Sequence, residues 1–325
     1  MASKKKTTDR AVVPPGLRAA FRALSALAPP LAAALAERLF LRTRRYPVPH
    51  REVAALQSAE RHELPTERGP AVAWVWGRPA PAAARVPTVF LVHGWEGRGS
   101  QLGAFVEPLR RAGFRVVAFD APGHGEAPGR SSSLPAIAAP LEAAARCWGP
   151  AAGVVAHSAG AVSTTFALSR GLAVERAVFV APGADLLGYT RWFAELLGLP
   201  DGVRRRLQAR IERRIGVAYA ALEPLELAPE RTTPLLAYSD REDPEAPLGT
   251  ARTLIGLWPG AELRVTEGLG HRRILRDPAV VAGAVEFLTG AAAPVRASEE
   301  ETSTRTGFGR SRRAGRGLEA AEAAP

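Results

Sequence analysis

One pentapeptide in the middle of the chain, Ala156-His157-Ser158-Ala159-Gly160, has the residue types of a nucleophile site. The apolar pair Val154-Val155 precedes it, and a stretch of small residues typical of a helix, Ala161 to Arg170, follows at once. A sharp turn between a strand and a helix exposes a serine hydroxyl, and small residues must flank that serine because the two backbones nearly touch. Ala156 stands where such turns usually have glycine. The alternative interpretation is that Ser158 only caps the helix, since serine is a preferred N-cap residue.

A serine hydroxyl becomes a strong nucleophile when a neighbouring base takes its proton and a third group orients that base. Of the six histidines, only His271 follows both the serine and an acidic loop after an apolar run. The acid should come from that loop, Ser239-Asp240-Arg241-Glu242-Asp243-Pro244, and both aspartates are candidates. We favour Asp243, because Asp240 should leave the sheet at once and cap the turn, whereas Asp243 can bend back toward His271.

Acyl transfer also needs two backbone N–H groups that point at the charge developing on the carbonyl oxygen. One should belong to Ala159, the residue after the candidate nucleophile. The other should belong to Trp95, in the turn His93-Gly94-Trp95-Glu96-Gly97 that follows an apolar run. Gly94 and Gly97 allow this backbone to turn inward. These two N–H groups are therefore the predicted oxyanion hole.

Composition argues against several other kinds of site. His93, His124 and His157 lie in three separate loops without helical spacing, so we expect no metal and no cofactor, and structural roles for His93 and His124. Lys4-Lys5-Lys6 are the only lysines among 43 basic residues, and the net charge of +11 comes from arginines spread along the chain. No zinc-finger spacing or basic stripe with aromatic residues is present, so no nucleic-acid partner is expected. The single cysteine, Cys147, excludes an intrachain disulfide and should be buried in a helix.

The elements that must position these residues alternate between strands and helices. The expected strands are Ala71–Gly77, Thr88–Val92, Phe114–Phe119, the run at Val154-Val155, Arg176–Ala181, Pro234–Tyr238 and Glu262–Thr266. Further helices are expected at about Gln101–Ala112, Ser132–Trp148 and Asp277–Leu288. Such alternation predicts an α/β fold with a mostly parallel sheet covered by helices on both faces. Sites in such sheets lie at the carboxyl ends of the strands, where the candidate residues fall.

Three segments lie outside this alternation. Residues 1–65 should form an N-terminal helical extension, and residues 290–325, with almost no large apolar side chains, should be disordered. The apolar part of the extension, Ala23–Ala36, is too short to cross a bilayer, which needs about 20 residues. We favour two short helices that pack on the main domain at 66–289 or rest at a membrane surface. A signal peptide is a further alternative, because Ala34-Leu35-Ala36 resembles a cleavage site.

Helical, arginine-rich sequence at about 183–231 interrupts the main domain in the position of a lid over the site. Its aromatic residues could present an apolar face to a substrate. Trp192 and Phe193, together with Trp95, are the predicted substrate contacts. The alternative, in which these side chains only pack the lid onto the domain, stays open.

Taken together, these loops resemble the α/β-hydrolase superfamily, in its serine-nucleophile, esterase- and lipase-like branch. The resemblance covers residues 86–289 and consists of five motifs in order: Leu91-Val92-His93-Gly94, Asp120-Ala121-Pro122-Gly123-His124-Gly125, Ala156-His157-Ser158-Ala159-Gly160, Asp243-Pro244 with Pro247, and Gly270-His271 with Asp277-Pro278. It implies an eight-stranded sheet and an acid three residues beyond the end of a strand, as Asp243 would be. Ser239-Asp240 departs from the His-Gly pair common there.

The predicted function is that of a serine hydrolase that cleaves a carboxylic ester or related acyl bond through an acyl-enzyme. Ser158 would attack, His271 would carry the proton, and Asp243 would orient the imidazole. Two alternatives stay open: a non-hydrolytic small-molecule receptor on the same fold, and an acyltransferase or carbon–carbon bond hydrolase. A small-molecule acyl compound is the expected partner, and the cytoplasm the expected location. The sequence predicts no oligomeric state.

Overall fold

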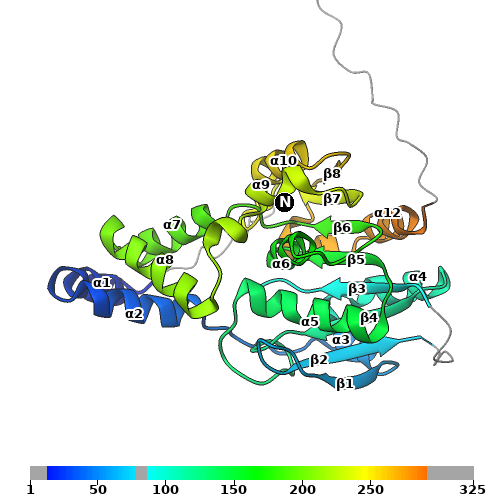
Figure 1. Cartoon of the computed structure of the whole chain (residues 1–325), viewed down its shortest axis with the longest axis horizontal. Coiled ribbons are helices and arrows are strands. Elements are labelled where there is room, and N and C mark those ends of the chain that lie inside the picture. The colour runs from blue at the N-terminus through cyan, green and yellow to red at the C-terminus, as the bar shows by residue number, and fades with distance from the viewer. Residues whose placement is uncertain (1–12, 78–85, 291–325) are drawn as a thin grey trace, which may run out of the picture. The chain divides into compact units, whose positions relative to one another are not determined.

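Eight strands form one sheet in the computed structural model, which describes residues 13–77 and 86–290 (Figure 1). Disorder was expected for residues 290–325, and all of these except Gly290 lie outside the described residues. The strands are β1 Glu60–Leu64, β2 Ala71–Trp76, β3 Thr88–Val92, β4 Arg115–Asp120, β5 Ala151–His157, β6 Ala177–Val180, β7 Leu235–Asp240 and β8 Glu262–Thr266.

The described helices lie between and around these strands. The α-helices are α1 Pro15–Leu27, α2 Pro29–Phe40, α3 His50–Leu56, α4 Val106–Arg111, α5 Leu134–Trp148, α6 Ala159–Ser169, α7 Leu186–Leu197, α8 Asp201–Ile215, α9 Pro224–Leu227, α10 Leu248–Leu257, α11 Gly270–Arg273 and α12 Pro278–Thr289. Four short 3-10 helices are η1 Gly99–Phe105, η2 Tyr219–Ala221, η3 Ala228–Glu230 and η4 Ile274–Arg276.

The strand order is β1-β2-β4-β3-β5-β6-β7-β8. The pairs β1–β2 and β2–β4 are antiparallel, and every pairing from β4 through β8 is parallel. The predicted α/β fold with an eight-stranded, mostly parallel sheet is confirmed. Because the parallel strands share one direction, the loops after β3, β5, β7 and β8 all leave from the same edge of the sheet.

Apolar side chains bury both faces of the sheet, as the continuous apolar runs predict for parallel strands. Neighbouring residues of one strand point to opposite faces, so Val154 lies in one core and Val155 in the other. Helices α5 and α6 contribute Ile137 and Phe166 to the first core, and α12 contributes Phe287 to the second. Complete burial of a valine or phenylalanine stabilises a fold by about 1.5–3 kcal/mol. The sheet edge that carries the candidate residues is therefore rigidly supported.

The structure corrects three sequence predictions. The stretch 1–65 is not wholly helical, because β1 pairs with β2 from Glu60 to Leu64 and begins the sheet. Asp240 does not leave the sheet at once, because β8 runs alongside β7 far enough to pair Asp240 with Thr266. Cys147 is exposed rather than buried, on α5.

The two N-terminal helices pack against the insertion between β6 and β7. Helix α2 contacts α8 through its fully buried alanines Ala32, Ala33 and Ala36, and α1 contacts α2 and α7. At the end of this face the buried Glu37 accepts hydrogen bonds from Arg210 Nε at 2.7 Å and Arg214 Nη1 at 3.3 Å. Over residues 13–77 and 86–290, no helix has the length and apolarity needed to span a bilayer.

The insertion comprises α7, α8, η2, α9 and η3, and occupies the predicted lid position. A buried carboxylate, Glu223, joins its two halves: Glu223 Oε2 accepts hydrogen bonds from the N–H groups of Leu186 at 3.1 Å and Leu187 at 3.3 Å. Burial raises the pKa of Glu223. The start of α7 is thereby attached to the chain that returns to β7.

Candidate active site

Ser158 occupies the sharp turn between β5 and α6 with a φ of 52°. A non-glycine residue in this left-handed region costs on the order of 1–3 kcal/mol and persists only where its surroundings demand it. The surroundings here are very close: a Cβ at Gly160 would lie 2.6 Å from the His93 carbonyl oxygen, and one at Gly94 would lie 3.0 Å from Ser158 Cβ. Ala156, in place of the usual glycine, fits with its side chain fully buried.

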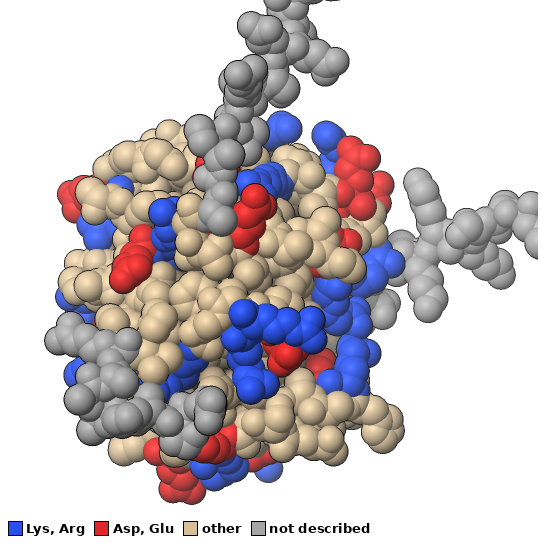
Figure 2. Space-filling model, turned by 90° about the vertical axis from the view of Figure 1, so that its right-hand side faces the viewer, with Lys and Arg blue, Asp and Glu red and all other residues tan. Residues whose placement is uncertain are grey.

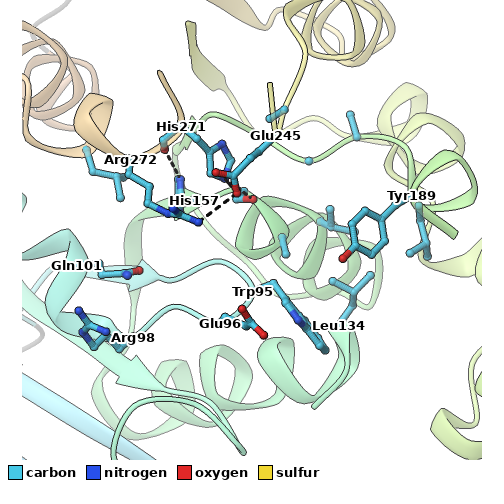
Figure 3. A pocket seen from close by; sticks show the side chains of 18 of the residues that line it. Trp95, Glu96, Arg98, Gln101, Leu134, His157, Tyr189, Glu245, His271 and Arg272 are labelled. Carbon is cyan, nitrogen blue, oxygen red and sulfur yellow. Dashed lines mark hydrogen bonds and ion pairs between the residues drawn. The ribbon is translucent and has the colours of Figure 1, made fainter. Parts of the chain in front are cut away.

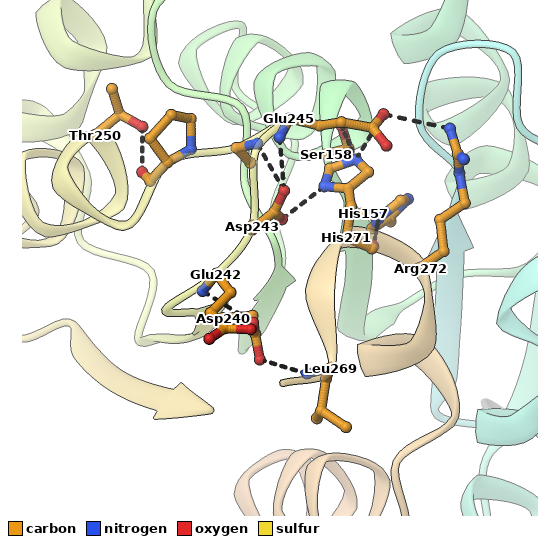
Figure 4. Close-up of polar contacts among 12 residues, drawn as sticks. His157, Ser158, Asp240, Glu242, Asp243, Glu245, Thr250, Leu269, His271 and Arg272 are labelled. Carbon is orange, nitrogen blue, oxygen red and sulfur yellow. Dashed lines mark hydrogen bonds and ion pairs between the residues drawn. The ribbon is translucent and has the colours of Figure 1, made fainter. Parts of the chain in front are cut away.

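Three side chains from three loops form one hydrogen-bonded chain at this turn (Figure 4). Ser158 Oγ lies 3.1 Å from His271 Nε2, and His271 Nδ1 lies 2.8 Å from Asp243 Oδ2. The second carboxylate oxygen of Asp243 accepts from the N–H groups of Glu245 at 2.8 Å and Ala246 at 3.0 Å. Because both oxygens have partners and the side chain is buried, the carboxylate is held in one orientation toward the imidazole.

Asp240 has a different environment and does not contact His271. Its carboxylate accepts hydrogen bonds from Leu269 N at 2.9 Å, Thr266 Oγ1 at 2.8 Å and Glu242 N at 3.1 Å. Burial acts to raise the pKa of Asp240, but these hydrogen bonds outweigh it and hold that pKa below its usual value. Asp240 therefore ties the loop after β7 to the loop that carries His271.

His157, directly before the serine, supports His271 from behind. Its Nε2 donates a hydrogen bond to the backbone carbonyl of His271 at 2.9 Å, and the two rings lie 4.7 Å apart. Burial, reinforced by the neighbouring His271, lowers the pKa of His157 to about 3, so its ring is neutral near pH 7. This positioning role was not predicted from the sequence. The only signal was the place of His157 next to the candidate nucleophile.

The turn with Trp95 stands against Ser158 through Gly94. It is closed by a hydrogen bond from Gly97 N to the Gly94 carbonyl at 3.0 Å, with Glu96 at a φ of 54°. The Glu96 carboxylate accepts from Arg44 N at 3.1 Å and Tyr46 Oη at 3.0 Å. The segment after α2 thus holds this turn in place. Across from it, Ala159 is the first residue of α6, where backbone N–H groups have no acceptor within the helix.

His93 and His124 brace the same region. His93 Nε2 accepts from Ala121 N at 3.1 Å, and its Nδ1 lies 2.7 Å from the Gly94 carbonyl. Burial lowers the pKa of both rings, that of His124 to about 3, so both are neutral near pH 7. Trp95 packs edge-on against His124 at 5.6 Å. Throughout the described residues, no three His, Cys, Asp or Glu side chains form a group suited to a metal ion.

A cavity of about 1810 Å³ lies over Ser158 and His271 (Figure 3). Ligand cavities usually measure about 300–1,000 Å³, so this one has room for a large substrate. Trp95, Tyr189 and Trp192 line it, and Figure 3 shows Tyr189 opposite the His271 side. Phe193, a predicted substrate contact, does not line this cavity. Its ring packs edge-on against Phe40 at 5.1 Å, because the next residue of a helix faces about 100° away.

Two charged residues at the cavity were not predicted. Glu245 Oε2 lies 3.3 Å from Arg272 Nη2 and 4.0 Å from His271 Nε2, and both side chains line the cavity (Figures 3 and 4). Arg272 follows His271 directly in the sequence, and Glu245 lies two residues after Asp243. No motif marked them, because their pairing depends on how the loops after β7 and β8 approach each other.

Solved structures similar to this chain share its fold. The Pyrococcus furiosus esterase Pf2001 is 19% identical with a TM-score of 0.57, and the match covers 76% of this chain and 98% of that one. A Butyrivibrio proteoclasticus protein with bound ferulic acid is 18% identical with a TM-score of 0.53, covering 71% and 97%. A Bacillus anthracis bromoperoxidase is 14% identical with a TM-score of 0.51, covering 71% and 100%. Identities this low, on a fold with several chemistries, establish the fold and no substrate.

No curated protein sequence matches the chain. The model of the alpha/beta hydrolase family matches residues 89–284, which include the serine turn, Asp243 and His271. This match covers more than half of the chain, and the sheet order and the turn at Ser158 agree with it. The resemblance inferred from the motifs is confirmed: the chain belongs to the alpha/beta hydrolase family.

Proposed function

We propose that this protein is a serine hydrolase that cleaves carboxylic esters through an acyl-enzyme intermediate. The observation that carries the proposal is the unbroken chain of hydrogen bonds from Asp243 through His271 to Ser158, which opens onto the large cavity. A serine, a base and a buried orienting carboxylate at these distances are the parts that nucleophilic acyl transfer needs.

In the first half of the reaction, Ser158 Oγ attacks the ester carbonyl while His271 Nε2 takes the hydroxyl proton. The carbonyl oxygen gains the electron pair and becomes an oxyanion, for which the N–H groups of Trp95 and Ala159 are the proposed donors. The tetrahedral intermediate then collapses, the bond to the alcohol oxygen breaks, and His271 returns the proton to that oxygen. The alcohol leaves and the acyl group remains on Ser158.

In the second half, water takes the place of the alcohol. His271 removes one proton from the water as its oxygen attacks the acyl carbonyl, and gives that proton to Ser158 Oγ as the acid leaves. Asp243 keeps the imidazole Nδ1 protonated throughout and stabilises the imidazolium that forms in each half. The hydrogen bond from His157 to the His271 backbone supports the same ring position.

The cavity lining supports an acyl group with a large apolar part. Leu134, Tyr189 and Trp192 surround the space away from His271, and an apolar acyl chain gains free energy there because it leaves water. The charged pair Glu245 and Arg272 lies at the His271 side, and the charged Glu96 and Arg98 also line the cavity. An uncharged ester could place its apolar acyl chain on the apolar side and its ester group on the polar side near His271.

The test is turnover of p-nitrophenyl esters of rising acyl length, together with labelling by a fluorophosphonate probe. Wild-type protein should hydrolyse the esters and become labelled, and Ser158→Ala should lose both, with a fall in turnover on the order of 10⁶. The matched control is Ser163→Ala, one turn along α6, whose hydroxyl bonds only to the Ala159 carbonyl at 3.0 Å. It should keep both.

Circular dichroism of both variants confirms folding before the comparison. Unchanged turnover in a folded Ser158→Ala protein would refute the proposal. Labelling of wild-type Ser158 without turnover of any ester in the series would instead favour the receptor or an acyl transfer to an acceptor other than water.

A further inference from the structure

Helices α1 and α2 present leucine side chains to solvent. Leu31, Leu35 and Leu39 of α2 are 51%, 37% and 37% exposed, and Leu27, at the end of α1, is 85% exposed. Residues four apart lie on the same side of a helix, so the three leucines of α2 form a stripe. We call these four residues the leucine stripe. The opposite side of α2 is the alanine face that packs on α8.

The charges around the leucine stripe are basic. Arg38 and Arg42, each three residues beyond a stripe leucine, are exposed. Arg18 and Arg22 of α1 are exposed too, but they border a hollow that is also lined by the exposed Glu195 of α7. Between residues 13 and 51 the sequence has one carboxylate, Glu37, which is buried and paired with arginines of α8. By contrast, the face that contains α4 and α12 carries basic and acidic side chains side by side (Figure 2).

Aromatic side chains connect the alanine side of α2 to the cavity, because Phe40 lies four residues beyond Ala36 on that side. Phe40, the last residue of α2, packs edge-on against Tyr189 at 5.7 Å, and Tyr189 lies 5.3 Å from Trp192. All three side chains line the cavity above Ser158. Tyr189 and Trp192 are also 49% and 44% exposed, so the same side chains meet both solvent and cavity.

The sequence outside the described range offers little to cover the leucine stripe. Residues 291–325 contain only Val295, Phe308 and Leu318 as large apolar residues, and residues 1–12 contain only Met1 and Val12. Leucines bordered by arginines, with no exposed carboxylate between them, match the chemistry of a bilayer surface with anionic headgroups. The leucines enter the acyl region, and the arginines extend their apolar stems and keep their charge at the headgroups.

We propose that the α1–α2 surface docks on an anionic lipid bilayer, so that acyl substrates pass from the bilayer into the cavity. Docking rests on the leucine stripe and its arginines alone. The delivery of substrate rests on the proposed hydrolase function.

Vesicle binding tests the docking step, with the full chain carrying Ser158→Ala so that no lipid is cleaved. Co-sedimentation is measured with phosphatidylcholine vesicles that contain or lack phosphatidylglycerol. We expect binding to the anionic vesicles that weakens as salt rises. Leu31→Ser with Leu35→Ser should weaken it by at least about tenfold, since apolar burial is lost. Arg38→Gln with Arg42→Gln should weaken it on anionic vesicles only.

The matched control is Leu257→Ser on α10, because Leu257 is 41% exposed but lies outside α1 and α2. It should bind vesicles as the parent protein does. Equal binding by the Leu31/Leu35 and Leu257 variants, or no binding by the parent protein, would overturn docking. So would a dimer in vesicle-free sedimentation that Leu31→Ser with Leu35→Ser dissociates, because the stripe would then join two copies of the chain.

Activity separates this inference from the proposed function. With Ser158 intact, the Leu31/Leu35 variant should hydrolyse a soluble short-chain ester as the wild type does, but lose at least about fivefold on an ester embedded in anionic vesicles. Equal losses on both esters would overturn the delivery step. Vesicle binding without hydrolysis of any ester by the wild type would support docking and refute the hydrolase function alone.

Discussion

The two ends of the cavity are built in different ways. At the polar end, Ser158, Asp243 and His271 follow strands β5, β7 and β8, and their side chains are held by hydrogen bonds. At the apolar end, Tyr189 and Trp192 project from a helix of the insertion and are nearly half-exposed. The polar end thus has geometry set by the sheet, whereas the apolar end has a shape set by helices packed over it.

This difference indicates a division of labour. Backbone hydrogen bonds between neighbouring parallel strands fix where the three polar loops begin, so their side chains meet with little freedom. The insertion is held by side-chain packing instead of strand pairing: Glu223 joins its own two halves, and arginines of α8 bond to Glu37 of α2. We expect substitutions at the polar end to change the rate of reaction, and those at the apolar end to change which substrate reacts.

The largest effect should come from the two aspartates of the polar end. Asp243→Asn should lower turnover by roughly 10⁴, because an amide cannot hold the imidazole in the required tautomer. Asp240→Asn should change turnover by less than about tenfold while lowering stability by about 1–3 kcal/mol, since it weakens buried hydrogen bonds between the two loops. The measurements are kcat and urea unfolding on both variants.

The reverse result, a crippled Asp240→Asn and a fully active Asp243→Asn, would transfer the orienting role to Asp240. Equal losses in both variants would mean that the polar end depends on loop position as a whole rather than on one carboxylate.

A second experiment compares neighbouring aromatic residues at the apolar end. Trp192→Ala should reduce kcat/KM for long acyl esters about tenfold more than for short ones, because the indole lines the cavity and each buried CH₂ is worth about 0.8 kcal/mol. Phe193→Ala should leave this ratio unchanged and instead lower the melting temperature, because its ring packs on Phe40. If Phe193→Ala instead changes the preference for long esters and Trp192→Ala only lowers the melting temperature, then Phe193 rather than Trp192 faces the substrate.

A smaller effect concerns the response of the polar end to acid. Burial lowers the pKa of both His124 and His157 to about 3, whereas the unfolded chain binds a proton at each near pH 6.5. The neutral rings therefore contribute stability that is fully present above about pH 6.5 and is lost as the pH falls toward 3. Between pH 7 and pH 5, each should account for a loss of roughly 2 kcal/mol in the free energy of unfolding.

Urea unfolding at the two pH values measures this loss. His157→Gln, which can still donate a hydrogen bond to the His271 carbonyl, should lose less stability on acidification than the wild type. His50→Gln, at an exposed position at the start of α3, is the control and should behave like the wild type. An identical loss of unfolding free energy in all three proteins would show that burial of the His157 ring does not make the polar end sensitive to acid.

Local sequence determined much of the polar end. The run from Val154 to Gly160 contains its own strand, turn and helix start, and small side chains are required wherever strand and helix touch. The apolar strands were equally readable, because strands covered on both faces are continuously apolar. The order of serine, acidic loop and histidine along the chain then places the three loops at one edge of the sheet.

Tertiary structure decided the features that depend on which faces meet. The sequence could not show that Trp192 faces the cavity while Phe193 faces Phe40, because both are aromatic neighbours on one helix. Nor could it show that β7 extends to Asp240, because the last pairing needs Thr266 of β8. The pairing of Glu245 with Arg272 and the packing of α2 on α8 are likewise long-range contacts. The pattern of apolar residues in one segment shows which of its sides is buried. It does not show which other segment packs against that side, and all of these contacts depend on that.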